Sequence, residues 1–179
     1  ERPQTYYGSS KLKADKELVA MNDREFKAAI IRPPMAYGGG MAPGNMLRLI
    51  RLVNKHIPLP FGSARNSRDF INVKNLVEFI HLAVEKEVEG VFYPTDKVPY
   101  STRNVVEEIS RQLGVHTINL PSPSIFLKLI EKVRPDLYQK LWGDVVIDRQ
   151  LALSAIGYEP RYTLEDGIRE MVESFKRQK

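Results

Sequence analysis

The sequence predicts an α/β protein, and three features of the chain point to this class. Short apolar runs of the buried-strand type alternate with longer segments that have a helical period. Prolines and glycines follow the apolar runs, where loops would leave a sheet. The 179 residues, of which 42% are hydrophobic, can bury the core of one compact domain.

The composition narrows the range of functions. With no cysteine and three scattered histidines, the chain lacks disulfides and the ligand spacing of a metal site, so we expect no metal. The absence of cysteine fits a reducing compartment. No run of eighteen apolar residues and no signal-peptide pattern occurs, so we expect a soluble protein without a membrane span. The net charge of +5 suits an anionic partner, but the basic residues are dispersed, which disfavours nucleic acid.

The first predicted element is a helix that contains the segment Tyr7-Gly8-Ser9-Ser10-Lys11 and ends near residues 22–23. Four residues make about one helical turn, so Tyr7 and Lys11 project from the same face. The pKa of a phenol is ordinarily about 10, and an ammonium one turn away lowers it toward the range of a useful base. Taken alone, however, such a pair is more often a solvated surface pair.

A buried strand is predicted at residues 26–31, and Arg32-Pro33-Pro34 ends it because consecutive prolines cannot stay in a central ladder. Residues 35–40 are predicted to form a flexible loop. Their three glycines lack the pattern of a phosphate-binding loop, so a plain turn is favoured. A helix follows to about residue 54, and Asn45 at its start is either an N-cap or part of an anion site.

The rest of the chain continues the alternation. The paired prolines make residues 57–62 extended, and Arg68 precedes an apolar run where it is a ligand contact or a surface ion-pair residue. We expect a well-covered helix at 75–84, a strand at 90–93, a helix capped by Ser101 or Thr102 and closed by Gly114, and a last helix at 164–175. The apolar helix at 125–133 could anchor on a membrane, but its few basic residues favour core or interface packing.

Four stretches together resemble one known family. They are the Tyr7–Lys11 segment with its flanks, Ile31-Arg32-Pro33-Pro34-Met35-Ala36-Tyr37-Gly38, Arg68-Asp69-Phe70-Ile71-Asn72-Val73, and the C-terminal region from Val145. In this order they are similar to the extended short-chain dehydrogenase/reductase family of NAD-dependent nucleotide-sugar epimerases and dehydratases. The resemblance implies the C-terminal part of a Rossmann-like doubly wound parallel sheet plus a small α+β substrate-binding domain. Residues 1–42 would belong to the NAD-binding domain and 43–179 mainly to the substrate domain, with 68–95 returning to the first.

The resemblance also implies roles for individual residues. Tyr7 and Lys11 would be catalytic, and with Pro34 they would contact NAD. The usual asparagine of the family is replaced by Met35, which puts one substrate contact in doubt. A second diphosphate-binding arginine is expected before Val145 but has no obvious counterpart. Substrate contacts are expected from Met35, Asn45, Met46, Leu59, Phe61 and Arg68.

The implied reaction is the NAD-dependent epimerisation of a UDP-hexose or related diphosphate-linked sugar through a transient keto-sugar. The segment at 57–68 most resembles cytoplasmic bacterial epimerases of surface-polysaccharide assembly, and the family usually forms homodimers through the Tyr7 helix. The glycine-rich turn and catalytic serine or threonine that precede the tyrosine in the family are absent, so we expect the chain to be part of a longer enzyme and inactive alone. A dehydratase or reductase of the same family, or a non-catalytic binding module with a vestigial half-site, remains an alternative.

Overall fold

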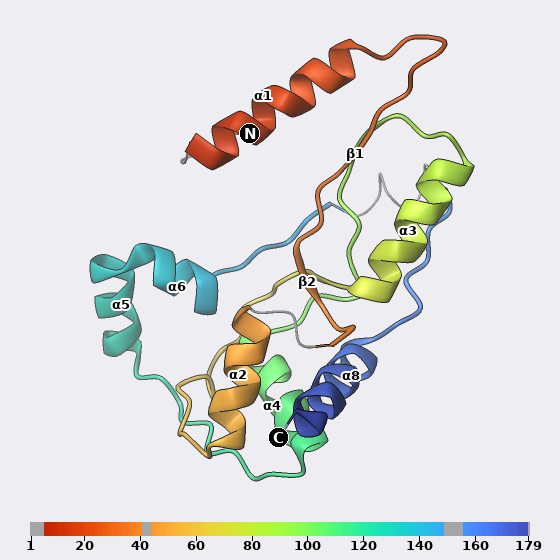
Figure 1. Cartoon of the computed structure of the whole chain (residues 1–179). Coiled ribbons are helices and arrows are strands. Elements are labelled where there is room, and N and C mark those ends of the chain that lie inside the picture. The colour runs from red at the N-terminus through yellow and green to blue at the C-terminus, as the bar shows by residue number, and fades with distance from the viewer. Residues whose placement is uncertain (1–5, 41–43, 149–155, 179) are drawn as a thin grey trace.

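The computed structural model describes residues 6–40, 44–148 and 156–178. Short parallel strands lie at the centre, with α1 at one end of the molecule and a group of helices at the other (Figure 1). The elements are α1 (Tyr6–Ala20), β1 (Ala29–Ile31), β2 (Met35–Tyr37), α2 (Asn45–Asn54), β3 (Phe70–Asn72), α3 (Val73–Glu85), β4 (Gly90–Phe92), α4 (Thr102–Leu113), α5 (Ser124–Val133), α6 (Pro135–Leu141) and α8 (Leu164–Arg177).

The described strands form two parallel pairs, which agrees with the predicted α/β class. β1 pairs with β4, with Ile30 opposite Val91, and β2 pairs with β3, with Ala36 opposite Ile71. The first strand is shorter than predicted, because the Asp23 carboxylate accepts hydrogen bonds from the two backbone N–H groups at 25 and 26. This turn takes residues 26 and 27 out of the expected ladder, while the Ala28 carbonyl still accepts the Gly90 N–H at 3.0 Å.

The loop predicted at residues 35–40 is wrong in its first half, because Met35–Tyr37 forms β2. The two prolines do end β1, but the residues after them again have N–H donors and pair with β3. Burial of Tyr37 against Phe70, with ring centroids 6.2 Å apart, favours this pairing. Residues 38–40 do turn the chain, and all three have positive φ angles that glycine adopts without strain.

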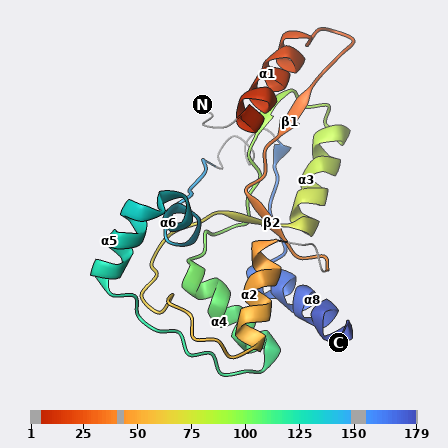
Figure 2. The same ribbon diagram turned by 60° about the vertical axis from the view of Figure 1, so that its left-hand side comes forward.

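The larger hydrophobic core lies among α2, α4 and α8, which group together in two views (Figure 2). The predicted boundaries of α4 and the predicted start of α8 hold because these ends have clear capping signals. Ser101 caps α4 with a reciprocal hydrogen-bond pair, and Gly114 closes it in the left-handed conformation. The start of α2 differs, since Gly44 occupies the N-cap without a side-chain hydrogen bond and Asn45 is the first helical residue.

Helix α3 has one covered and one uncovered apolar face. Phe79 and Ala83 pack in a second core with Phe92 and Tyr158. On the other side, the Val77 side chain and its neighbours one and two turns away are exposed, so the prediction of a well-covered helix is wrong. Hydrophobic periodicity shows which residues are apolar but does not show what lies opposite each face.

Helices α5 and α6 pack on each other and project to one side of the molecule in both views (Figures 1 and 2). None of the residues of α5 is buried, so core packing, one of the two expectations for this helix, is wrong. Among the described residues, no helix is long and apolar enough to cross a membrane.

A buried polar cluster connects the central strands to α3. Asp96 accepts hydrogen bonds from the Tyr37 hydroxyl at 2.5 Å, the Asn72 backbone N–H at 2.9 Å and the Asn75 side-chain amide at 2.7 Å. Asn75 in turn bonds the backbone of Tyr162, just before α8. Burial raises the pKa of the Asp96 carboxyl, and the hydrogen bond from Tyr37 works in the opposite direction.

Candidate functional site

A cavity of about 500 Å³ lies between α2, α4 and α6, with β2, β3 and the extended segment at 59–61 completing its wall. We call it the α2–α6 cavity. All the residues expected from the sequence to contact substrate line it, although they are spread over 34 positions of the chain, from 35 to 68. These residues are Met35, Asn45, Met46, Leu59, Phe61 and Arg68.

The extended segment places Leu59 and Phe61 in the wall because its backbone is held by a distant part of the chain. Leu59 donates its N–H to the carbonyl of Ile118 at 3.0 Å and accepts from the N–H of Leu120 at 2.8 Å. The N–H of Phe61 donates to the Asn119 side chain at 3.0 Å. Both apolar side chains are buried, so they form a fixed apolar surface.

Arg68 brings a positive charge to the cavity on a rigid backbone. Its N–H and carbonyl exchange hydrogen bonds with Tyr100 at 3.0 and 2.8 Å. One guanidinium nitrogen, Nη1, donates to the carbonyls of Gln139 at 2.7 Å and Gly143 at 2.8 Å. Burial lowers the pKa of Arg68 and the nearby Asp144 raises it. Within the described part of the chain, the other guanidinium donors have no partner and remain available for an anionic ligand.

The opposite wall was not predicted from the sequence. It comes from α6 and the residue after it, and it includes the cation Lys140 and the indole of Trp142. The Trp142 ring packs 5.2 Å from that of Phe61, and its buried Nε1 donor has no partner among the described residues. A second diphosphate-binding arginine was expected before Val145, but the cation that this stretch brings to the cavity wall is a lysine, Lys140.

Of the predicted catalytic and cofactor residues, Lys11 and Pro34 do not line this cavity. Tyr7 is in the first turn of α1, but its side chain lies outside what the structure describes. Lys11 is exposed on α1, and Pro34 is half-buried between β1 and β2. The structure therefore gathers the predicted substrate residues and leaves the predicted acid–base pair on a separate element.

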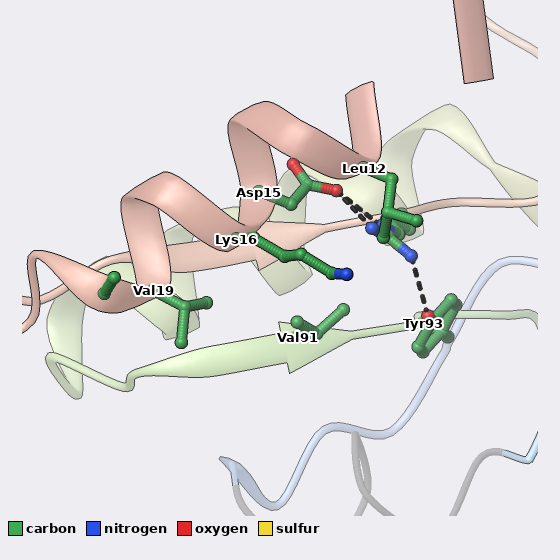
Figure 3. Close-up of a pocket in the computed structure, with 8 residues that line it drawn as sticks. Leu12, Asp15, Lys16, Val19, Val91 and Tyr93 are labelled. Carbon is green, nitrogen blue, oxygen red and sulfur yellow. Dashed lines mark hydrogen bonds and ion pairs between the residues drawn. The ribbon is translucent and has the colours of Figure 1, made fainter. Parts of the chain in front are cut away.

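Helix α1 is fastened to the central strands by an ion pair that sequence reasoning missed. Arg32, just after β1, donates from Nε to Asp15 of α1 at 2.8 Å and from Nη1 to the Tyr93 hydroxyl at 3.2 Å. Dashed lines mark the contacts that Asp15 and Tyr93 make with this guanidinium (Figure 3). Both members of the ion pair are largely buried, at 24% and 18% exposure. They lie in a groove of about 450 Å³ between α1 and β4, beside the apolar residues Leu12, Val19 and Val91. Asp15 is one turn beyond Lys11, so this contact fixes the part of the helix next to the predicted catalytic lysine.

We expect Asp15→Asn to loosen α1, because Arg32 would lose a largely buried charged partner. Amide hydrogen exchange measured by mass spectrometry should become about tenfold faster in α1. Glu17→Gln is the matched control, since its pair with Lys13 on the same helix is exposed and contributes little. Equal exchange in the two variants would show that the Arg32 contact does not hold the helix.

Comparisons with known proteins identify relatives of this chain. A model of the NAD dependent epimerase/dehydratase family matches residues 1–93. The UDP-glucose 4-epimerase of Vibrio cholerae is 35% identical over 179 aligned residues, which cover 97% of this chain and 54% of that protein. The chain therefore spans about half the length of this relative.

Solved structures show the same fold at lower identity. The UDP-glucuronic acid 4-epimerase of Bacillus cereus in complex with NAD matches with a TM-score of 0.75 and 18% identity, over 99% of this chain and 54% of that one. The dTDP-glucose 4,6-dehydratase of Bacillus anthracis in complex with NAD matches with a TM-score of 0.73 and 19% identity, over 99% of this chain and 54% of that one. At these identities the likeness concerns the fold.

Proposed function

The chain belongs to the NAD dependent epimerase/dehydratase family, and we propose that it carries the substrate cavity and the acid–base pair of an NAD-dependent epimerase acting on a UDP-hexose. The predicted fold, part of a Rossmann-like doubly wound parallel sheet, is confirmed by the solved structures. The observation that carries the functional proposal is the α2–α6 cavity, which joins apolar and aromatic walls to three cations, Arg48, Arg68 and Lys140. Such a lining suits a nucleotide diphosphate. The 35% identical relative is itself a UDP-glucose 4-epimerase.

The residues present fit one end of NAD. Lys11 is exposed on α1 and has the donors that ribose hydroxyls require, and Pro34 follows β1, at the end of a parallel strand where such folds bind ligands. The sequence has no Gly-x-Gly-x-x-Gly turn after a strand to hold the dinucleotide phosphates. Lys11 and Pro34 therefore fit the nicotinamide ribose of NAD, and other residues would have to bind the dinucleotide phosphates. When bound, NAD supplies reversible hydride transfer.

The chain's own residues would hold the substrate and move one proton. Arg68 and Lys140 would bind the diphosphate, with Phe61 and Trp142 packing on the nucleoside side. The Tyr7 phenolate would take the proton of a sugar hydroxyl and later return it. The positive charge of Lys11 would lower the pKa of this phenol and keep it in the required form near neutral pH.

Other features of the molecule support a wider form of this proposal. Pairing of β4 with β1 supports a division in which residues 68–95 return to the dinucleotide-binding part. Exposed Leu18 and Met21 support packing of a second copy along α1, as in a homodimer. The absence of cysteine supports a cytoplasmic location, where surface-polysaccharide precursors could be made from nucleotide sugars.

The proposal is tested by isothermal titration of the protein with UDP-glucose, with and without NAD. We expect micromolar binding of UDP-glucose and no binding of free glucose, since most contacts are to the diphosphate and nucleoside. Assay of UDP-galactose formation by an enzyme that contains this chain then separates an epimerase from a dehydratase or reductase. Failure to bind UDP-glucose even in that enzyme would contradict the proposal.

Arg68→Ala should weaken UDP-glucose binding about 10- to 100-fold, because a charge-assisted hydrogen bond contributes roughly 1.5–3 kcal/mol. Arg65→Ala is the matched control, because Arg65 lies three residues before Arg68 in the chain and lines a different cavity. Lys140→Gln should cause a smaller loss, because Lys140 is exposed and an ammonium binds phosphate as a point charge. If the Arg68 and Arg65 variants bound UDP-glucose with equal affinity and unfolded at the same temperature as the wild type, Arg68 would not be a substrate-binding residue.

A further inference from the structure

Helix α5 exposes an apolar surface that no described element covers. Ile125 is 81% exposed, Val133 64%, Leu129 59% and Phe126 43%. We call these residues the α5 stripe. Leu127 and Ile130 are the half-buried residues of the helix, and α5 packs on α6. The α5 stripe is therefore a second apolar face, separate from the one used inside the hairpin.

The charges of α5 are arranged around this stripe. At about 100° per residue, the four side chains fall within an arc of roughly 100°. Lys128 and Lys132 lie along one border of that arc, whereas Glu131 lies about opposite its centre. Within the described part of the chain, neither lysine has an ion-pair partner. A surface that contacts the α5 stripe therefore also contacts the free ammonium groups of Lys128 and Lys132 and no carboxylate of this helix.

A comparison with α3 shows that this combination is not a general property of the exposed helices. Val77, Ile80 and Val84 also form an exposed stripe, with 60%, 42% and 72% of their surface accessible. Next to that stripe lie His81 and Lys74, whose ammonium is paired with Glu170, and Glu85 and Glu78 lie beyond them. The two helices thus present similar apolar surfaces, but the lysine beside the α3 stripe is ion-paired and carboxylates lie near it, whereas the α5 stripe is bordered by two lysines.

We propose that the α5 stripe and its two lysines dock the protein on an anionic lipid surface. An amphipathic helix with apolar residues on one face and lysines beside them lies in the plane of such a surface, and ten residues, about 15 Å, cannot cross it. Each flanking lysine adds attraction to anionic headgroups, and the net charge of +5 acts in the same direction. A second copy would instead bring a like net charge to the stripe.

Docking through the α5 stripe would bring the α2–α6 cavity close to the lipid surface. α6 follows α5 directly and provides Leu137 and Lys140 to the α2–α6 cavity. The α6 side of the cavity would then lie close to the headgroups. This inference rests on exposure and charge, not on the proposed reaction, so the two fail independently.

The test is flotation of the protein with vesicles of phosphatidylcholine alone or mixed with phosphatidylglycerol. We expect binding to the mixed vesicles that weakens as salt is raised. Ile125→Ser with Leu129→Ser should lower binding at least tenfold, and Lys128→Gln with Lys132→Gln about tenfold on the anionic vesicles. Val77→Ser with Val84→Ser is the matched control and should bind as the wild type does.

Two results would overturn the proposal. One is equal vesicle binding by the wild type and both α5 variants. The other is a wild type that does not bind vesicles but becomes monomeric when the stripe is replaced by serine, which would assign the stripe to a contact between copies. Because the substituted side chains are exposed, thermal unfolding should be unchanged, and the lysine variants leave the apolar surface intact if the serine variants fold poorly.

Discussion

Replacing Tyr7 by phenylalanine in an enzyme that contains this chain is expected to lower the turnover of UDP-glucose by about 10²- to 10⁴-fold. This is the usual contribution of a positioned acid–base group. The affinity for UDP-glucose should change little, because the residues proposed to bind it line the α2–α6 cavity, whereas Tyr7 belongs to α1. Steady-state kinetics with titration of the same ligand would measure both effects.

The neighbouring Tyr6 offers a matched control for this variant. Tyr6 is 98% exposed and begins α1 one residue earlier, so it does not share a face with Lys11. Tyr6→Phe should therefore keep normal turnover. A Tyr7→Phe enzyme that also kept normal turnover would exclude the acid–base role and favour the reading of this helix as part of a non-catalytic module.

Much of the helical framework was predictable because its signals are local. The boundaries of α4 follow from Ser101 and Gly114, and those of α8 from a strong apolar period that begins after Thr163. β2 was missed because three residues after two prolines have no period of their own. Its pairing with β3 depends on contacts made 35 residues away in the chain.

Only one wall of the candidate site could be predicted from the sequence. The positions at 35–68 were identified through a family resemblance, and the structure brings all of them to one cavity. The facing wall, with Lys140 and Trp142, comes from residues about 70 positions later. Composition could not show that α6 would close over Arg68, and the exposure of α5 was equally hidden, because burial is a property of the tertiary structure.

The largest loss of stability is expected from Asp96→Ala. The change leaves the Tyr37 hydroxyl, the Asn72 N–H and the Asn75 amide without their buried acceptor. Each unsatisfied buried donor costs about 1–3 kcal/mol, and Asn75 keeps its bond to Tyr162, so the total should be about 3–5 kcal/mol. Urea unfolding followed by circular dichroism measures it. Asp136→Ala is a suitable control, because that carboxylate is exposed and makes no hydrogen bond within the described part of the chain.

The pH dependence of stability tests whether the Asp96 carboxyl is protonated in the folded protein. Burial raises the pKa of Asp96 in the folded protein above its unfolded value of about 3.9. Between these two values the folded protein holds a proton that the unfolded chain releases, so this contribution to stability is lost as pH rises through the folded pKa. Asp96→Asn does not titrate, and the stability gap between the wild type and this variant should therefore narrow as pH rises above about 4. A gap that widened instead would mean that the three hydrogen bonds outweigh burial and hold the Asp96 pKa low.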